Sequence, residues 1–136
     1  MRKRTLRAIV LAVLFFGSYS LAEAEEKKSS LLSIQEGVMC LDVVDRVPVG
    51  TGDIFPKEVP KLFCFTKVLG AQTPTTITHI WYHNGALESK VTLPVNSVSW
   101  RTWSSLMMTP EKAGEWMVEI VTEDGIALES IIFLIR

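Results

Sequence analysis

Two histidines, His79 and His83, are the residues best suited by type to acid–base or metal chemistry. They flank Trp81 within a segment, Thr75–Tyr82, whose composition favours a β-strand. Residues four apart on a strand are separated by about 13 Å, since each residue advances about 3.3 Å. One zinc ion, with nitrogen ligands at about 2 Å, therefore cannot bind both side chains. We expect no metal site, and an enzyme would need His79 in a concave pocket with a carboxylate in hydrogen-bond reach.

Candidate nucleophiles lack the partners that would activate them. Ser104 and Ser105 have no G-x-S-x-G context. Cys64 lies in a predicted core strand, where burial disfavours the thiolate. The Gly50-Thr51-Gly52 segment is followed neither by a helix nor by a phosphate-binding lysine. The sequence therefore predicts a protein that is not an enzyme and uses no cofactor.

Large aromatic side chains are the residues in this sequence that most clearly suggest a binding surface. Trp81 and Trp116 occur in apolar alternation, which predicts core positions. Trp100 and Trp103 are three apart, so a strand would send them to opposite faces, with Arg101 between them. An exposed ring beside a guanidinium suits sugar stacking, a peptide partner or a cation–π contact. The alternative is that both rings are buried and Arg101 pairs with a carboxylate. Our candidate ligand or partner residues are Tyr82, His83, Asn84, Trp100, Arg101 and Trp103.

The first 24 residues have the three parts of a cleavable signal peptide. Four basic residues lie among the first seven, residues 8–16 are uniformly apolar, and Ala22-Glu23-Ala24 is an A-x-A cleavage site. The apolar stretch is shorter than the roughly 20 residues that span a bilayer, although retention as an anchor is the alternative. We expect a periplasmic or extracellular protein with no membrane span after cleavage.

Removal of residues 1–24 makes the chain acidic. Lys+Arg falls from 14 to 10, and Asp+Glu falls from 15 to 14 because Glu23 is removed, which leaves a net charge of −4. The remaining basic residues form no cluster along the sequence. Nucleic acids and anionic lipid surfaces both attract basic proteins. The charge pattern therefore argues against both classes of partner.

The only two cysteines, Cys40 and Cys64, would lie in a compartment that permits disulfides. A bridge would close a loop of about 24 residues and contribute about 3 kcal/mol in the chain-entropy model. Sequence spacing does not show whether the two Cβ atoms meet. The sequence is therefore compatible with a Cys40–Cys64 disulfide and with two buried thiols.

Alternation with a period of two residues dominates the chain after a charged, flexible tether at 25–35. Residues 36–136 contain about seven strand-like segments, with Asn84-Gly85 and Asp124-Gly125 as hairpin signals. Residues 46–60, with three prolines and two glycines, indicate a long loop or an edge segment. This pattern predicts a single all-β domain, an immunoglobulin-like antiparallel β-sandwich preceded by a signal peptide. A small closed barrel is the alternative.

Several motifs, taken in order, resemble a known family. They are Asp45–Pro48 (DRVP), Leu62–Val68 (LFCFTKV), Thr78–Gly85 (THIWYHNG), Ser99–Ser105 (SWRTWSS) and Gly114–Val118 (GEWMV). They are similar to the bacterial domain-of-unknown-function family 2914, over roughly Gly37 to Arg136. The resemblance implies a bacterial envelope protein with one compact β domain. It implies no activity, substrate or catalytic residue.

These observations favour a non-catalytic binding or assembly module of the bacterial periplasm or cell envelope. Such a module would contact a protein partner through a strand edge or an aromatic patch. The alternative is a carbohydrate-binding module for peptidoglycan or exopolysaccharide that uses Trp100 or Trp103. Exposed coplanar rings would favour this alternative, and buried rings would exclude it. An enzyme that uses His79 is the third hypothesis.

Overall fold

A computed structural model describes residues 30–136. The expected signal peptide and the start of the expected tether lie outside these residues. The described part contains ten strands and one 3₁₀ turn, with no α-helix. The strands are β1 (Ser33–Cys40), β2 (Asp42–Val44), β3 (Val47–Val49), β4 (Ile54–Phe55), β5 (Lys61–Leu69), β6 (Thr75–His83), β7 (Ala86–Val95), β8 (Ser99–Met107), β9 (Gly114–Thr122) and β10 (Ala127–Ile135); the 3₁₀ turn is η1 (Pro110–Lys112). Within this range, no helix is long and apolar enough to cross a membrane.

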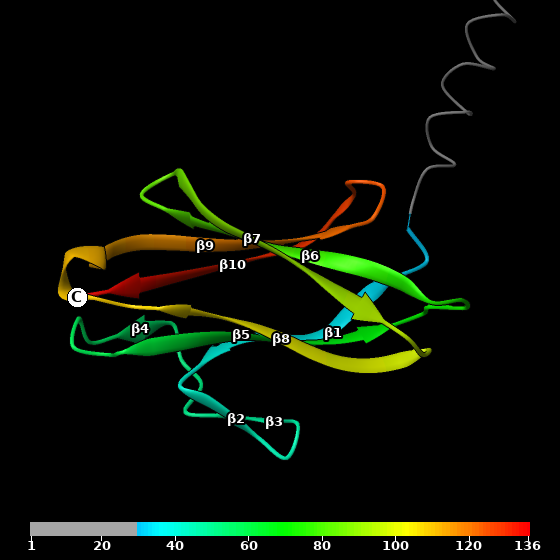
Figure 1. The fold of residues 1–136 in the computed structure, drawn as a ribbon, viewed down its shortest axis with the longest axis horizontal. Coiled ribbons are helices and arrows are strands. Elements are labelled where there is room, and N and C mark those ends of the chain that lie inside the picture. Colours follow the sequence, from blue (N-terminus) through cyan, green and yellow to red (C-terminus); the bar gives the residue numbers. More distant parts are fainter. Residues whose placement is uncertain (1–29) are drawn as a thin grey trace, which may run out of the picture.

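The strands form three sheets. A three-stranded sheet has the order β1-β5-β8, a five-stranded sheet has the order β4-β10-β9-β6-β7, and β2 and β3 form a two-stranded hairpin. The two larger sheets lie as two layers, and the β2–β3 hairpin projects from the outer side of the three-stranded sheet (Figure 1). All pairings are antiparallel except that of β4 with β10. The all-β class expected from the alternation is therefore confirmed.

The long and short strands differ in how visible they are in the sequence. Seven strands have eight to ten residues and correspond to the alternating segments. The other three have two or three residues; β3 and β4 lie within 46–60, which was expected to be a long loop or an edge segment, and β2 precedes it. Pro48 is tolerated in β3 because this strand has a partner on one side only. Strand β1 begins at Ser33, so residues 33–35, which we assigned to the tether, are paired with β5 or lie at its bulge.

The β6–β7 hairpin has the turn that the sequence indicates. Asn84 and Gly85 both have positive φ, at 50° and 81°, as a type I′ turn requires. The Asn84 side chain also accepts a hydrogen bond from the Glu115 backbone N–H at 3.0 Å, which ties the turn to β9. A Cβ at Gly114, whose φ is 132°, would lie 2.6 Å from Asn84 Oδ1. The turn and its neighbour therefore both depend on the glycines present.

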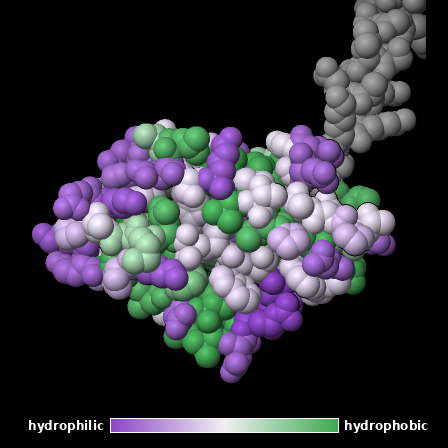
Figure 2. Space-filling model, in the orientation of Figure 1, coloured by the Kyte–Doolittle hydropathy of each residue, from purple (hydrophilic) through white to green (hydrophobic). Residues whose placement is uncertain are grey.

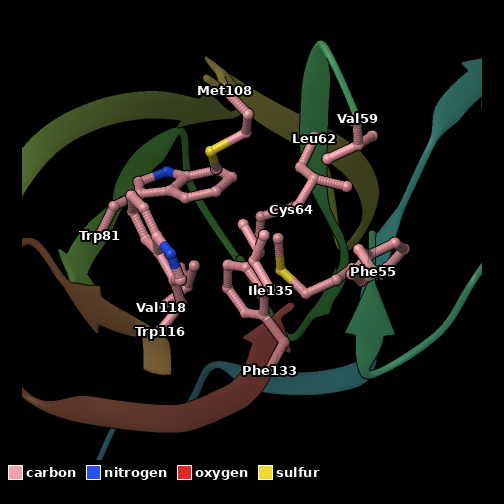
Figure 3. Packing of buried hydrophobic residues seen from close by; sticks show 11 residues of the cluster. Phe55, Val59, Leu62, Cys64, Trp81, Met108, Trp116, Val118, Phe133 and Ile135 are labelled. Atoms are coloured by element: carbon pink, nitrogen blue, oxygen red, sulfur yellow. The ribbon is translucent and has the colours of Figure 1, made fainter. Parts of the chain in front are cut away.

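The larger of two core clusters is aromatic and joins the two layers. Trp116 and Phe133 stack at 5.8 Å, and Trp81 meets both rings edge to face at 6.5 and 6.3 Å. These three rings come from the five-stranded sheet and pack toward Leu62 and Cys64 of β5 (Figure 3). Trp81 and Trp116 are fully buried, as their alternation predicted. The smaller cluster, at the other end of the sheets, contains Val68, Ala71, Ile77, Val95 and Ile120.

Cys40 and Cys64 are free thiols that lie on neighbouring strands. Cys40 pairs with Phe63 and Cys64 pairs with Met39, so the two cysteines occupy adjacent rather than opposite positions in the ladder. Side chains at successive positions point to opposite faces of a sheet. The two sulfurs are therefore directed away from each other. Burial raises the pKa of the Cys40 thiol to about 11 and raises that of Cys64 further, which keeps both protonated.

We predict two thiols per chain that react only after unfolding. In the native protein, burial and the raised pKa of each cysteine suppress thiolate formation and access of a thiol reagent such as dithiobis-nitrobenzoate. In denaturant without reductant, both cysteines are expected to react. A denatured, unreduced chain with no reactive thiol would show that the bridge left open by the sequence exists.

Candidate functional site

An apolar groove of about 900 Å³ lies beside the β2–β3 hairpin. Its walls come from the segment around the base of the hairpin and from the chain between β4 and the start of β5. The apolar lining residues are Leu41, Ile54, Phe55, Pro56, Val59, Pro60 and Phe63. Three charged residues also line it, namely Asp42, Glu58 and Lys61. The groove thus offers mainly aliphatic and aromatic surface with a few charges.

The hairpin extends this apolar surface. Asp42, Val44, Val47 and Val49 are exposed, whereas Val43 and Pro48 are half-buried, so one face of the hairpin points to solvent. Five large hydrophobic side chains between residues 41 and 54 are each exposed by 47–52%, namely Leu41, Val44, Val47, Val49 and Ile54. Hydrophobic surface is visible over the hairpin beside a strongly hydrophilic area (Figure 2). Contiguous exposed apolar surface of this kind marks interaction sites.

The six site residues expected from the sequence fall into two groups at opposite ends of the layers. Tyr82, His83 and Asn84 lie at the end of β6, where it turns into β7. Trp100, Arg101 and Trp103 lie on β8, which follows the other end of β7. Val95, at that end, pairs with Thr75 at the start of β6. The structure therefore does not bring the six residues together into one site.

His83 is held by structural contacts. Its ring stacks on Trp116 at 4.5 Å, and its Nε2 lies 2.9 Å from the Ala113 carbonyl oxygen, to which it donates. Its Nδ1 lies 3.6 Å from a carboxylate oxygen of Glu88. Both ring nitrogens and one ring face are thus engaged, and the side chain anchors the segment before β9 to the β6–β7 turn.

Trp100 and Trp103 do not form a shared platform. Trp103 pairs with Phe65 across the sheet and stacks on it at 6.4 Å, while Trp100 pairs with Val68 and packs against the smaller core cluster. Both tryptophans are half-buried. Each ring has one face covered. Phe65 covers a face of Trp103, and the Arg46 guanidinium lies 5.4 Å from the centre of the Trp100 ring. The two positions are three apart on one strand, and so they face opposite sides of the sheet as expected.

His79 lies in the interior and joins the two layers through hydroxyl groups. Its Nδ1 lies 2.7 Å from Ser104 Oγ and its Nε2 lies 3.2 Å from Thr66 Oγ1. Trp81 Nε1 donates to the same Ser104 oxygen at 3.0 Å, and Thr66 donates to the Thr102 carbonyl at 3.0 Å. All four side chains are buried. We refer to His79, Ser104, Thr66 and Trp81 as the interlayer network.

One arrangement of protons satisfies every member of the interlayer network. Thr66 has given its only hydroxyl proton to Thr102, so its oxygen accepts from His79 Nε2–H. His79 Nδ1 then accepts the hydroxyl proton of Ser104, whose oxygen accepts from Trp81. Neutral His79 is therefore required, and burial lowers its pKa to about 4.

The enzyme hypothesis required His79 in a concave pocket beside a carboxylate. The ring is fully buried, and its two partners are hydroxyl groups. The Ser104–His79 pair resembles a nucleophile with its base, but Ser104 is itself buried between the sheets, and its hydroxyl is already bonded to both His79 and Trp81. The geometry therefore gives His79 and Ser104 a structural role. Residues 30–136 contain no group of three or more His, Cys, Asp or Glu side chains arranged to hold a metal ion.

The family comparison bears on the second half of the described chain. Residues 74–135 match the family model described as Protein of unknown function (DUF2914). The resemblance is therefore confirmed for these residues. We had expected it to run from about Gly37, and β1 to β5 lie outside the DUF2914 match. No curated protein matches the chain.

Within the DUF2914 match, the motifs that carried the resemblance mainly build the fold. His79 and Trp81 belong to the interlayer network, Asn84-Gly85 forms the turn, and Trp116 lies in the core. The groove residues, from Leu41 to Phe63, all precede the matched range. These groove residues were not predicted from the sequence, because segments rich in proline and glycine show no regular alternation of apolar and polar residues. The dense valines at 43, 44, 47 and 49 were the available hint of an extra hairpin.

Proposed function

We propose that the chain is a non-catalytic protein-binding module that uses the apolar groove and the exposed face of the β2–β3 hairpin. The exposed hydrophobic surface at residues 41–54, continuous with the groove, carries this proposal. The groove alone, at about 900 Å³, has the volume of a small-molecule site, but the exposed side chains of Val44, Val47 and Val49 lie beyond its lining, and a protein partner can cover both. Burial of exposed apolar surface is the main driving force for association between proteins.

The partner that fits is a protein segment with aliphatic side chains and a basic residue at its flank. Aliphatic side chains complement Leu41, Ile54 and Phe55 in the groove. Asp42 and Glu58 supply negative charge there, while the Lys61 ammonium lies 4.9 Å from the Phe63 ring. Complementary charges set orientation and exclude wrong partners more than they add affinity. A lysine or arginine beside the apolar side chains would meet the two carboxylates.

The carbohydrate-binding alternative has weaker support. It calls for exposed aromatic rings that share a plane, as a platform for sugar rings. Trp100 is covered by Arg46 and Trp103 is stacked on Phe65, and the two face opposite sides of the sheet. We therefore favour the protein partner.

The strand order supports an immunoglobulin-like arrangement as part of this proposal. Of the seven long strands, the first, second and fifth share the layer β1-β5-β8, and the third, sixth and seventh lie in the layer β10-β9-β6-β7, a division that immunoglobulin domains also have; the fourth, β7, lies beside β6. Trp81 is a buried tryptophan on the third long strand, which is another feature of immunoglobulin domains. Residues 1–24 support export to the periplasm or beyond, where such modules commonly bind other proteins.

Photo-cross-linking from single positions tests the proposed surface in cells that produce the protein. A photoreactive phenylalanine analogue replaces Ile54 in the groove or, as a matched control, Leu87 on β7, because the two side chains are 52% and 56% exposed. We expect a discrete protein adduct from position 54 and none from position 87. Mass spectrometry of the adduct should identify an aliphatic segment with a flanking lysine or arginine.

A second variant links the adduct to the groove itself. Leu41→Glu places a charge in the apolar wall and is expected to reduce the yield of the position-54 adduct about tenfold or more, since burying an unpaired charge is costly. Adducts of the same proteins from both positions, or an adduct that Leu41→Glu leaves unchanged, would contradict the proposal.

A further inference from the structure

A second, smaller cavity of about 280 Å³ lies beside the tip of the β2–β3 hairpin and has a different chemistry. It is lined by Arg46, Lys67, Ser97, Ser99, Trp100 and Arg101. Three of these six residues are cations and none is an acid. They are three of the ten basic residues that follow residue 24, in a region of net charge −4. This basic cluster is not visible in the sequence, because the fold assembles it from three distant segments.

The three cations converge although their charges repel one another. Lys67 and Arg101 are directly opposite across β5 and β8, an arrangement of like charges that destabilises a sheet. Glu36 lies opposite Lys67 on β1, yet no carboxylate oxygen of residues 30–136 lies within 4 Å of the charged groups of Arg46, Lys67 or Arg101. The positive charge of the pocket is therefore left without a close carboxylate.

Arg46 reaches this pocket from a backbone conformation that is unfavourable for arginine. Asp45 and Arg46 form the two-residue turn between β2 and β3, and their φ angles are 51° and 63°. Glycine, asparagine or aspartate usually occupies such positions, so Asp45 suits its place, whereas a residue such as Arg46 costs about 1 kcal/mol there. Backbone strain of this kind is concentrated at functional sites. Here it places the guanidinium over the Trp100 ring, 5.4 Å from its centre, where a cation–π contact fixes it.

We propose that this pocket binds a phosphate group. Two guanidinium groups offer paired N–H donors that match phosphate oxygens, and the Lys67 ammonium adds a point charge. Ser97 donates its hydroxyl proton to the Ser99 carbonyl oxygen, and both serines line the pocket beside the cations. Three positive charges suit a dianion better than a carboxylate, which neutralises only one. The Trp100 face is covered by Arg46, so a sugar ring would not stack there.

Calorimetric titration of the purified protein with inorganic phosphate tests this site. We expect saturable binding, with acetate at equal ionic strength at least about tenfold weaker because it carries one charge. Arg46→Gln and Arg101→Gln should each weaken phosphate binding by about tenfold or more, the usual loss for a charge-assisted hydrogen bond. Lys90→Gln, which removes an exposed lysine on β7, should leave it unchanged. Arg46, Lys90 and Arg101 are all exposed, so we expect the three variants to fold. A thermal melt of each variant checks this.

Two further titrations identify the source of the phosphate group. Glucose 6-phosphate represents a soluble phosphomonoester, and vesicles that contain phosphatidic acid represent a lipid headgroup. Arg46-dependent binding of either would support the site and name its source. No binding of any phosphate compound beyond that of acetate, or equal binding by wild type and Arg46→Gln, would overturn the proposal. Neither outcome affects the groove, which shares no lining residue with this pocket.

Discussion

Ser104→Ala is expected to lower the free energy of unfolding by about 3 kcal/mol, although it removes a single oxygen atom. That oxygen accepts from Trp81 Nε1–H, and its proton is donated to His79 Nδ1. Without it, His79 Nδ1 and Trp81 Nε1 lose their hydrogen-bond partner in the buried space between the sheets. Each unsatisfied buried group costs about 1–3 kcal/mol. Urea unfolding followed by tryptophan fluorescence measures the change.

Ser105→Ala is the matched control for this substitution. Ser105 is the next residue on β8 and faces the other side of the sheet, where it is only half-buried and lies outside the interlayer network. Its replacement should change the free energy of unfolding by about 0.5 kcal/mol or less. Equal effects of the two substitutions would contradict the assigned network.

Stability is expected to fall as the pH is lowered from 6.5 to 4, and His79 is the cause. Burial lowers the pKa of His79 to about 4 in the folded protein, from 6.5 for a free side chain. Between these values the unfolded chain binds the proton and the folded chain does not. Because the unfolded state binds more protons, the free energy of unfolding rises with pH in this window. The full contribution is about 3 kcal/mol, present above pH 6.5 and lost as the pH falls to 4.

Comparison of the wild type with His79→Leu isolates this contribution. Glu129 acts in the opposite sense, because burial raises the pKa of its carboxyl, but it is present in both proteins and cancels. We expect urea unfolding at a series of pH values to show a smaller loss of stability in His79→Leu than in wild type. Identical pH profiles for wild type and His79→Leu would contradict a neutral, buried His79.

The long strands were predictable, because each carries its own alternating pattern. Trp81 and Trp116 were placed in the core for that reason, and the Asn84-Gly85 turn has a strong local preference for positive φ. The short strands β2, β3 and β4 were not predicted. They contain two or three residues each and lie among prolines and glycines, so no period could be seen.

The candidate sites depend on contacts that the sequence does not encode locally. His79 and its partner Ser104 are 25 residues apart, and their contact follows from the packing of two sheets. The cations of the phosphate pocket come from a hairpin tip and two paired strands. The relation of Cys40 to Cys64 was fixed by the register of β1 and β5, which spacing along the chain cannot give. Residue type did identify Trp100 and Arg101, which line that pocket.

We propose that the partner binds at residues 41–63 rather than at the family motif around His83. Backbone amide NMR tests it most directly, with the purified protein titrated by a synthetic peptide of the cross-linked segment. We predict the largest shift changes at groove residues such as Leu41, Ile54 and Phe63, with little change at Tyr82, His83 and Asn84. Shift changes that concentrate at the β6–β7 turn and leave the groove residues unaffected would show that the partner does not bind in the groove.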